Sequence, residues 1–158
     1  MSVVYIALGS NLNCPAEQLR MAISALRQLP LSKVVAVSSF YGSKPLGPQD
    51  QPDYVNAVLC LQTELAPLAL LDELQRIENQ QKRVRLRRWG ERTLDLDILL
   101  YDNLIQQTER LKLPHYDMQN REFVIIPLLE IAPSLVLPCG TNLVELARKF
   151  SDHKMEKF

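Results

Sequence analysis

RWGERTLDLDILLY, residues 88–101, joins a basic segment to one in which apolar and polar residues alternate. The alternation from Thr93 to Ile98 has the two-residue period of a β-strand, which predicts that Asp95 and Asp97 share one face. The apolar residues between them then lie on the opposite face. Residues two apart on a strand are separated by about 7 Å, and carboxylates so spaced can both reach divalent ions held about 4 Å apart. The pattern therefore indicates a metal-dependent phosphoryl-transfer site.

An alternating strand with two aspartates is also typical of a solvated sheet face, and the strand alone leaves that interpretation open. Aspartate is disfavoured in strands, and two like charges on one face repel each other unless a cation or arginines neutralise them. The segment from Lys82 to Arg92 carries six basic residues and a single acid, Glu91. A run of charges at a helix end is usually only solvated surface. Here it directly precedes the paired carboxylates, and this combination favours binding of a metal-bound polyphosphate.

The composition favours a single domain spanning residues 1–158. This length suits one domain with its own core, and 18 basic residues balance 18 acidic ones, so no net charge attracts nucleic acid or a membrane. Three cysteines without a C-x-x-C pair indicate neither a disulfide framework nor a zinc site. The first residues lack the positive region of a signal peptide, and no apolar run reaches the roughly 18 residues of a membrane span. We therefore expect a cytoplasmic protein, and a monomer.

Apolar periodicity predicts the regular elements around the acidic strand. We expect strands at residues 3–8, 33–41, 54–62 and 93–98, and helices at residues 15–29 and from Pro67 to the basic segment. The second helix should bury a stripe of Leu68, Leu71, Leu74 and Ile77. This order predicts an α+β fold with a ferredoxin-like βαββαβ core, in which helices pack on one face of an antiparallel sheet.

Additions follow this core toward the C-terminus. We expect a short edge strand after the turn at Asn103 and an apolar helix-like stretch from Phe123 to Ile131 that Pro127 interrupts. A last helix should span residues 143–150, and the charged tail carries no clear pattern.

Several residues outside the acidic strand are candidates for ligand contact. Residues 42–53 form a long loop rich in glycine and proline, which favours a mobile lid, although a loop without function stays an alternative. Asn56 lies within an apolar strand, so its amide needs hydrogen bonds from the backbone or from a ligand. His115 is either structural or a phosphate contact, and Arg121 with Phe123 can present a cation and a ring to one cleft.

The sequence lacks the common phosphate-binding and nucleophile motifs. None of its five glycines forms G-x-x-x-x-G-K-[ST] or G-x-G-x-x-G, so side chains must hold any phosphates. There is also no G-x-S-x-G elbow and no cysteine with evident histidine support, which argues against a covalent nucleophile. Metal-assisted group transfer remains, because it needs charge neutralisation and positioning more than covalent help.

Four segments together resemble the 6-hydroxymethyl-7,8-dihydropterin pyrophosphokinase family of folate biosynthesis. They are YIALGSNL at residues 5–12, PLGPQDQPDY at 45–54, RWGERTLDLDIL at 88–99 and PHYDM at 114–118, in the family's order. The resemblance implies transfer of pyrophosphate from ATP to the pterin hydroxymethyl oxygen, with release of AMP and with two Mg²⁺ ions on the phosphates. It further implies loops that close over both small-molecule substrates, ATP and the pterin.

The resemblance also assigns roles to individual positions. Asp95 and Asp97 match the metal ligands, and Arg83 and Arg92 match the arginines that stabilise the transition state. The pterin-binding positions are Ser43, Leu46, Tyr54, Asn56, Trp89 and Phe123. The ATP-binding positions are Gln75, Glu78, Arg85, Trp89, Ile98, Arg110, Lys112, His115, Tyr116 and Arg121. The chain departs from the family pattern in a basic loop about one residue shorter, and in Gly42-Ser43-Lys44, where the family has Arg-Thr-Pro.

Two other classes of protein share parts of this pattern. A ferredoxin-like sheet can bind RNA, but such a sheet needs stacking aromatics and an RNP1-like segment, and here its strands offer Tyr5 and two aspartates. A metal-dependent nucleotidyltransferase or cyclase also uses paired carboxylates, and it releases pyrophosphate from ATP where a pyrophosphokinase releases AMP. The reaction products distinguish these classes.

Overall fold

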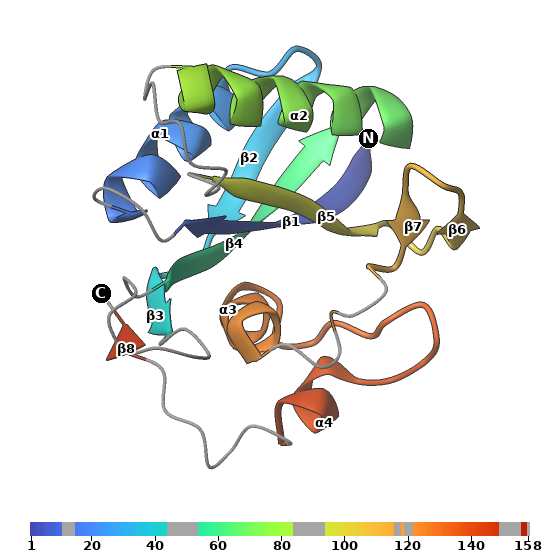
Figure 1. The fold of residues 1–158 in the computed structure, drawn as a ribbon. Coiled ribbons are helices and arrows are strands. Elements are labelled where there is room, and N and C mark those ends of the chain that lie inside the picture. The colour runs from blue at the N-terminus through green and yellow to red at the C-terminus, as the bar shows by residue number, and fades with distance from the viewer. Residues whose placement is uncertain are drawn as a thin grey trace.

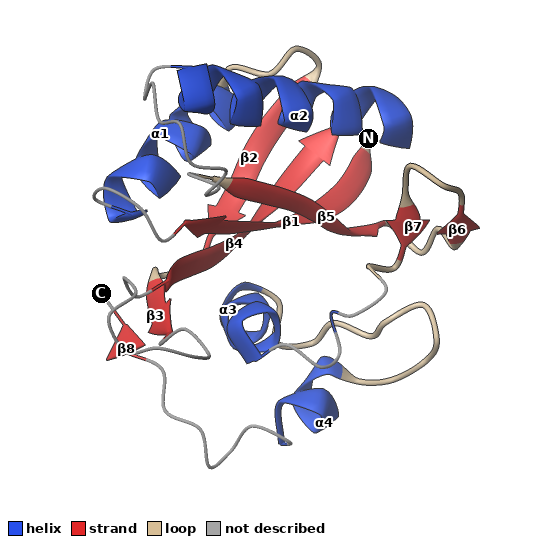
Figure 2. Cartoon of the chain, viewed as in Figure 1, coloured by secondary structure: helices blue, strands red, loops and turns tan. Residues whose placement is uncertain are grey.

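The computed structural model describes residues 1–10, 15–43, 54–83, 94–115, 118, 122–148 and 156–157. These residues form an antiparallel sheet with helices on both faces (Figures 1 and 2). Its strands are β1 (Ser2–Ser10), β2 (Ser32–Val37), β3 (Tyr41–Ser43), β4 (Tyr54–Thr63), β5 (Asp95–Tyr101) and β8 (Glu156–Lys157). The helices are α1 (Pro15–Arg27), α2 (Pro67–Arg83), α3 (Glu122–Ile131) and α4 (Leu143–Ala147), and a small hairpin joins β6 (Gln106–Gln107) to β7 (Lys112–Leu113).

The strand order confirms the predicted ferredoxin-like core. The path through the sheet is β5-β1-β4-β3-β8, with β2 also paired to β4, and the elements β1-α1-β2-β4-α2-β5 follow the βαββαβ order. The central strand β1 is antiparallel to both β4 and β5. Its uniformly apolar sequence is explained by this position, because both faces of β1 are covered.

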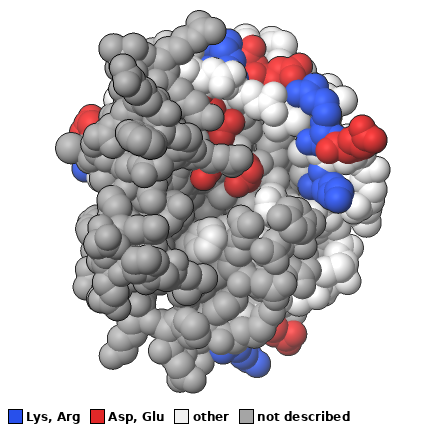
Figure 3. All heavy atoms as spheres, in the orientation of Figure 1, with Lys and Arg blue, Asp and Glu red and all other residues white. Residues whose placement is uncertain are grey.

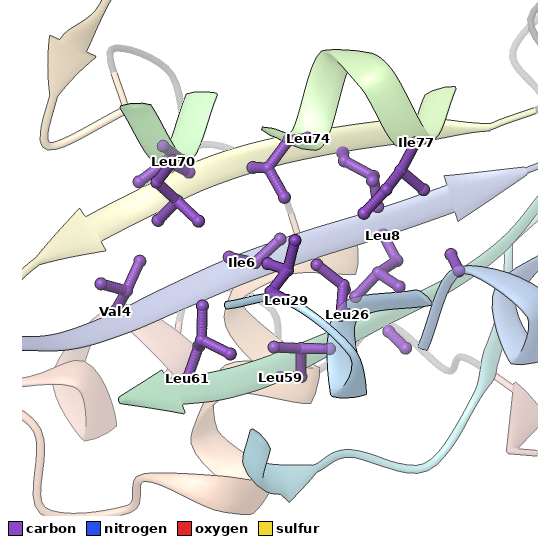
Figure 4. Close-up of a cluster of buried hydrophobic side chains, with 14 of the residues drawn as sticks. Val4, Ile6, Leu8, Leu26, Leu29, Leu59, Leu61, Leu70, Leu74 and Ile77 are labelled. Carbon is purple, nitrogen blue, oxygen red and sulfur yellow. The ribbon is translucent and has the colours of Figure 1, made fainter. Parts of the chain in front are cut away.

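The first core lies between the sheet and helices α1 and α2 (Figure 4). Leu74 and Ile77 of α2 and Leu26 of α1 are essentially inaccessible to solvent. They pack against alternate residues of the strands, including Ile6 and Leu59. Each fully buried side chain of this size contributes about 1.5–3 kcal/mol, so this face supplies a large share of the stability.

The second core lies on the other face of the sheet, under α3 and α4 (Figure 1). Val124, Ile125 and Leu128 of α3 are buried there together with Val58 of β4. An extra residue in β5, Leu99, interrupts the register with β1 and also enters this core. The helices of the βαββαβ core, α1 and α2, therefore cover one face as predicted, and α3, one of the C-terminal additions, covers the other.

Several predicted boundaries were wrong in detail. The first strand runs through Gly9 to Ser10, and the strand expected at 33–41 is two short strands, β2 and β3. The last helix ends at Ala147, and the single edge strand after Asn103 is the β6–β7 hairpin. The tail contains β8, which pairs with β3 and which no sequence pattern predicted.

The buried stripe of α2 differs from the expected one. Leu70, Leu74 and Ile77 are buried, whereas Leu68 is 39% exposed. Since α2 begins at Pro67, Leu68 lies in its first turn and points away from the sheet side that Leu70 and Leu74 share.

Helix α3 continues through Pro127 instead of breaking there. A proline inside a helix costs about 3 kcal/mol. Burial of Val124, Ile125 and Leu128 exceeds that cost, because each contributes about 1.5–3 kcal/mol.

Candidate functional site

The two aspartates of β5 lie on the α3 side of the sheet. Leu94, Leu96 and Ile98 are buried in the first core, as the alternation predicted. Asp95 and Asp97 therefore leave the opposite face, and both are half-buried. The two carboxylates thus share one face at a sheet edge, where β5 has β1 on one side only.

A row of residues runs across the sheet from Asp95 on that face. Asp95 is paired with Gly9 of β1, Gly9 with Asn56 of β4, and Asn56 with Tyr41 of β3. Directly paired residues of an antiparallel sheet point to the same side, and neighbouring strands are about 4.8 Å apart. The amide of Asn56 and the carboxylate of Asp95 therefore share one surface, with their strands about 10 Å apart.

Gly9 makes room for Asn56 in this row. A Cβ atom at Gly9 would lie 3.0 Å from Asn56 Oδ1, closer than real Cβ contacts normally are. Ala7, two residues along, is paired with Asp97 and is also small. The part of β1 between the aspartates and the β4 amide therefore carries little side-chain volume. In the sequence, Gly9 directly follows the apolar strand predicted at residues 3–8, and its role in making room for Asn56 was not predicted.

Two hydrogen bonds to backbone groups of β5, one of them made by a side chain, hold this edge strand. Glu78 of α2 accepts the Leu96 N–H at 3.0 Å through Oε2. The His115 N–H donates to the Leu99 carbonyl at 2.9 Å. Since Leu96 lies between the two aspartates, the Glu78 carboxylate fixes the strand that presents them.

Three predicted ATP-binding positions lie near the β6–β7 hairpin. Arg110 Nη2 lies 2.6 Å from Asp72 Oδ1 and 3.3 Å from Gln75 Oε1, which joins the hairpin to α2. These side chains and Lys112 are exposed. Figure 3 shows basic and acidic side chains side by side toward the edge where Figure 1 places the hairpin, and further acidic side chains nearer the middle of this face. No sequence pattern indicated that Asp72 would pair with Arg110, which is 38 residues away.

Ile98, another predicted ATP-binding position, is 3% exposed and belongs to the first core. Any contact of Ile98 with a nucleotide is therefore made by its backbone.

The predicted pterin-binding residues that the structure describes belong to three elements, β3, β4 and α3. Asn56 of β4 is 6% exposed, and Phe123, at the start of α3, is half-buried against the second core. Ser43 of β3 is paired with Tyr54 of β4, two residues from the Asn56–Tyr41 pair. The backbone thus brings these strand positions to one end of β3 and β4, on a sheet whose face α3 covers.

The remaining predicted site residues are not fully described. Leu46, Arg85, Trp89, Arg92, Tyr116 and Arg121 lie outside the described residues, as do positions 44–53 of the expected lid. Gly42 and Ser43 of that segment belong to β3. Arg83 is the last residue of α2 and the second residue of the basic segment.

Glu130 is a polar residue of this region that sequence reasoning missed. Its carboxylate accepts hydrogen bonds from Ser39 and Tyr41 across about 90 positions of the chain. Burial raises the pKa of Tyr41, and the hydrogen bond to Glu130 raises it further. Tyr41 is therefore a protonated donor at neutral pH.

Asp95 and Asp97 suit a cation that is coordinated partly by the protein and partly by substrate phosphates. Among the described residues no group of three or more His, Cys, Asp and Glu side chains can hold a metal ion. Mg²⁺ is usually bound through one or two carboxylates plus substrate phosphates, which matches the donor set of Asp95 and Asp97. Among the described helices, none has the length and apolar character needed to cross a membrane.

Comparison with known proteins identifies the family. The model of the 7,8-dihydro-6-hydroxymethylpterin-pyrophosphokinase family matches residues 5–133, which include most of β1, Asn56, both aspartates and Phe123. The chain belongs to this family. It is 69% identical over 157 residues to the 2-amino-4-hydroxy-6-hydroxymethyldihydropteridine pyrophosphokinase of Haemophilus influenzae, covering 99% of this chain and 98% of the relative. It is 57% identical to the Pseudomonas aeruginosa protein of the same name over 143 residues, 90% of this chain and 88% of that relative.

Solved structures agree on the fold. The HPPK-DHPS protein of Plasmodium falciparum, solved with pterin and p-hydroxybenzoate, superposes with a TM-score of 0.73 at 14% sequence identity. The match covers 96% of this chain and 43% of that longer chain. At this identity the likeness supports the ferredoxin-like architecture alone.

Proposed function

We propose that this member of the pyrophosphokinase family transfers the diphosphate group of ATP to the hydroxymethyl group of 6-hydroxymethyl-7,8-dihydropterin. The products are AMP and the pterin diphosphate, and the step belongs to folate biosynthesis. The observation that carries the proposal is the row from Asp95 through Gly9 to Asn56. The row combines a half-buried carboxylate, the proposed cation ligand, and a buried amide on one surface, with a glycine between them that leaves space.

The phosphate end of this site is formed by β5. Asp95 and Asp97 would hold Mg²⁺ ions that also bind the ATP phosphates, and when bound these ions neutralise charge on the polyphosphate. Glu78 keeps β5 in place through Leu96, so both carboxylates stay on the same face. The arginines proposed to stabilise the transferred group, Arg83 and Arg92, both belong to the basic segment that leads into β5.

The pterin end is formed by β3, β4 and α3. The amide of Asn56 offers both a donor and an acceptor, which suits the hydrogen-bonding edge of a pterin. Phe123 and Tyr54 supply the aromatic rings proposed to stack on it. The pterin oxygen then bonds to the β-phosphorus of ATP, the bridging oxygen leaves with AMP, and the hydroxyl proton is released.

The adenine products of a defined reaction test this proposal. Purified protein is incubated with ATP, Mg²⁺ and 6-hydroxymethyl-7,8-dihydropterin, and nucleotides and pterins are separated by chromatography. We expect AMP and pterin diphosphate in equal amounts, and none when the pterin or Mg²⁺ is omitted. Release of pyrophosphate would indicate a nucleotidyltransferase or cyclase, and binding of RNA without turnover would indicate an RNA-binding module.

We also propose that the enzyme acts as a cytoplasmic monomer on these two small molecules, without nucleic acid or membrane as a partner. Size-exclusion chromatography with light scattering should give the mass of one 18.1 kDa chain. A stable dimer would contradict this.

A further inference from the structure

Glu130 connects α3 to the segment that joins β2 and β3. The Ser39 N–H lies 3.0 Å from both carboxylate oxygens, and Ser39 Oγ donates to Oε2 at 2.9 Å. The Tyr41 hydroxyl donates to Oε1. We call these residues, Glu130, Ser39 and Tyr41, the Glu130 clamp.

The segment beside the clamp is also held by hydrogen bonds at Ser38 and by two short strand pairings. Between β2 and β3, Ser38 takes the place of a regular ladder residue: its N–H donates to the Val58 carbonyl, and its Oγ accepts the Val58 N–H at 2.9 Å. Strand β3 itself has only three residues. It pairs with β4 over three residues and with β8 over two, so both of its ladders are short. The charge-assisted hydrogen bonds to Glu130 therefore add to what holds β3 in position.

The clamp lies between the two sides of the proposed pterin site. Tyr41 is paired with Asn56, and Ser43 at the end of β3 is paired with Tyr54. Phe123 lies seven residues before Glu130 on the same helix, about two turns or 10 Å along its axis. The helix that carries the ring and the strand that adjoins the amide are therefore joined through one carboxylate.

We propose that Glu130 is a positioning residue for the pterin: it sets the distance of α3 from β3, and thereby the alignment of Phe123 with Asn56. The proposal rests on the proposed function, since it assigns the pterin to this end of the site. The Glu130 clamp lies beside β3, whereas the proposed cation site is on β5, two strands further across the sheet beyond β4. We therefore expect the effect of Glu130 to be specific for the pterin.

Steady-state kinetics with both substrates varied, combined with amide hydrogen exchange of the ligand-free protein, test this. In Glu130→Ala we expect faster exchange in residues 39–43 and a KM for the pterin raised roughly five- to tenfold, as loss of hydrogen bonds to a charged group predicts. The KM for ATP and kcat should stay within about twofold of the wild-type values, a smaller change than loss of one hydrogen bond to a charged group would cause. Glu130→Gln, which keeps one acceptor oxygen, should restore part of the pterin affinity.

Glu145→Ala removes another exposed glutamate, on α4, and serves as the matched control with wild-type kinetics. An unchanged pterin KM in Glu130→Ala would overturn the inference, even if exchange in residues 39–43 became faster. So would equal rises of both KM values, or a Glu130→Gln variant no better than alanine, because these indicate a general structural role. If the wild-type protein does not turn over the pterin, the proposed function itself is overturned. The wild type alone reveals this outcome, so it is distinguished from a failure of the inference about Glu130.

Discussion

The two faces of the central sheet use the same strands for different purposes. On the α1/α2 face, alternate residues of β1, β4 and β5 are large and apolar, and nearly all are inaccessible to solvent. On the α3 face, the residues between them include Asp95, Asp97, Gly9 and Asn56, followed further along the strands by the second core. The α1/α2 face therefore contributes to stability along its whole length. The α3 face does so only where the second core lies, and its other end carries the polar residues of the candidate site.

This difference means that neighbouring residues should respond differently to substitution. Leu96 and Asp97 are adjacent in β5 but point to opposite faces. A change on the α1/α2 face should lower the free energy of unfolding and leave the chemistry of the folded protein intact. A change at the polar end of the α3 face should impair the chemistry and leave the free energy of unfolding nearly unchanged.

The largest effect is expected for Asp97→Asn, which removes a cation ligand without changing size. We expect kcat to fall by about 10²–10³-fold or more, the scale on which loss of charge stabilisation at a reacting group acts. The urea midpoint should remain near that of the wild type. A variant that retains turnover would exclude Asp97 from the metal site. A variant that unfolds would contradict the claim that this end of the α3 face contributes little to stability.

Leu74→Ala tests the opposite face. Leu74 is fully buried in the first core (Figure 4), so truncation should lower the free energy of unfolding by about 2–5 kcal/mol. Activity per folded molecule, measured well below the melting temperature, should be unchanged. Loss of kcat with full stability would show that this face also takes part in catalysis.

Phe123→Ala tests the aromatic part of the pterin site. Loss of a stacking ring should weaken pterin binding by about 1–3 kcal/mol in calorimetric titration, with ATP affinity unchanged. Because Phe123 also packs on the second core, Phe123→Leu is the control that keeps apolar volume but removes the ring. Wild-type pterin affinity in the alanine variant would exclude Phe123 from the site.

Gly9→Ala tests the space in the row between the aspartates and the amide. The added Cβ would lie 3.0 Å from Asn56 Oδ1, so the amide must shift. We expect pterin affinity to fall by about 1 kcal/mol, the low end of overpacking effects. In an Asn56→Ala background the same change should have no effect on affinity. An equal loss in both backgrounds would show that Gly9 does not act through Asn56.

The smallest effect is expected for Asp72→Asn at the surface. The Asp72–Arg110 pair is about half exposed on both sides, and exposed ion pairs contribute about 0–1 kcal/mol. Both the unfolding free energy and the KM for ATP should change little, and less still at high salt. A large rise in the KM for ATP would mean that Asp72 orients Arg110 for the nucleotide.

The faces also explain which parts of this fold could be predicted from sequence. The two-residue period of β5 correctly separated Leu94, Leu96 and Ile98 from the aspartates, and that of β4 separated Ala57 and Leu59 from Asn56. Such periods report local geometry, which is what fixes the face of a side chain. The elements and their order followed from the same signal.

Long-range polar contacts could not be predicted in this way. Glu130 and Ser39 are 91 residues apart, and nothing in the spacing of either residue indicates the other. The pairing of the tail strand β8 with β3 is equally non-local. The burial of Leu70 in place of Leu68 depended on where α2 begins relative to the sheet, which only packing determines.

The central claim is that the α3 face transfers two phosphoryl groups together from ATP to a pterin. ATP labelled with radioactive phosphorus at the β-position, incubated with Mg²⁺, the protein and 6-hydroxymethyl-7,8-dihydropterin, tests it most directly. The account predicts that the label leaves the nucleotide and elutes with the pterin, and that Asp97→Asn abolishes this. Label that remains in ADP, or that is released as free pyrophosphate, would contradict it.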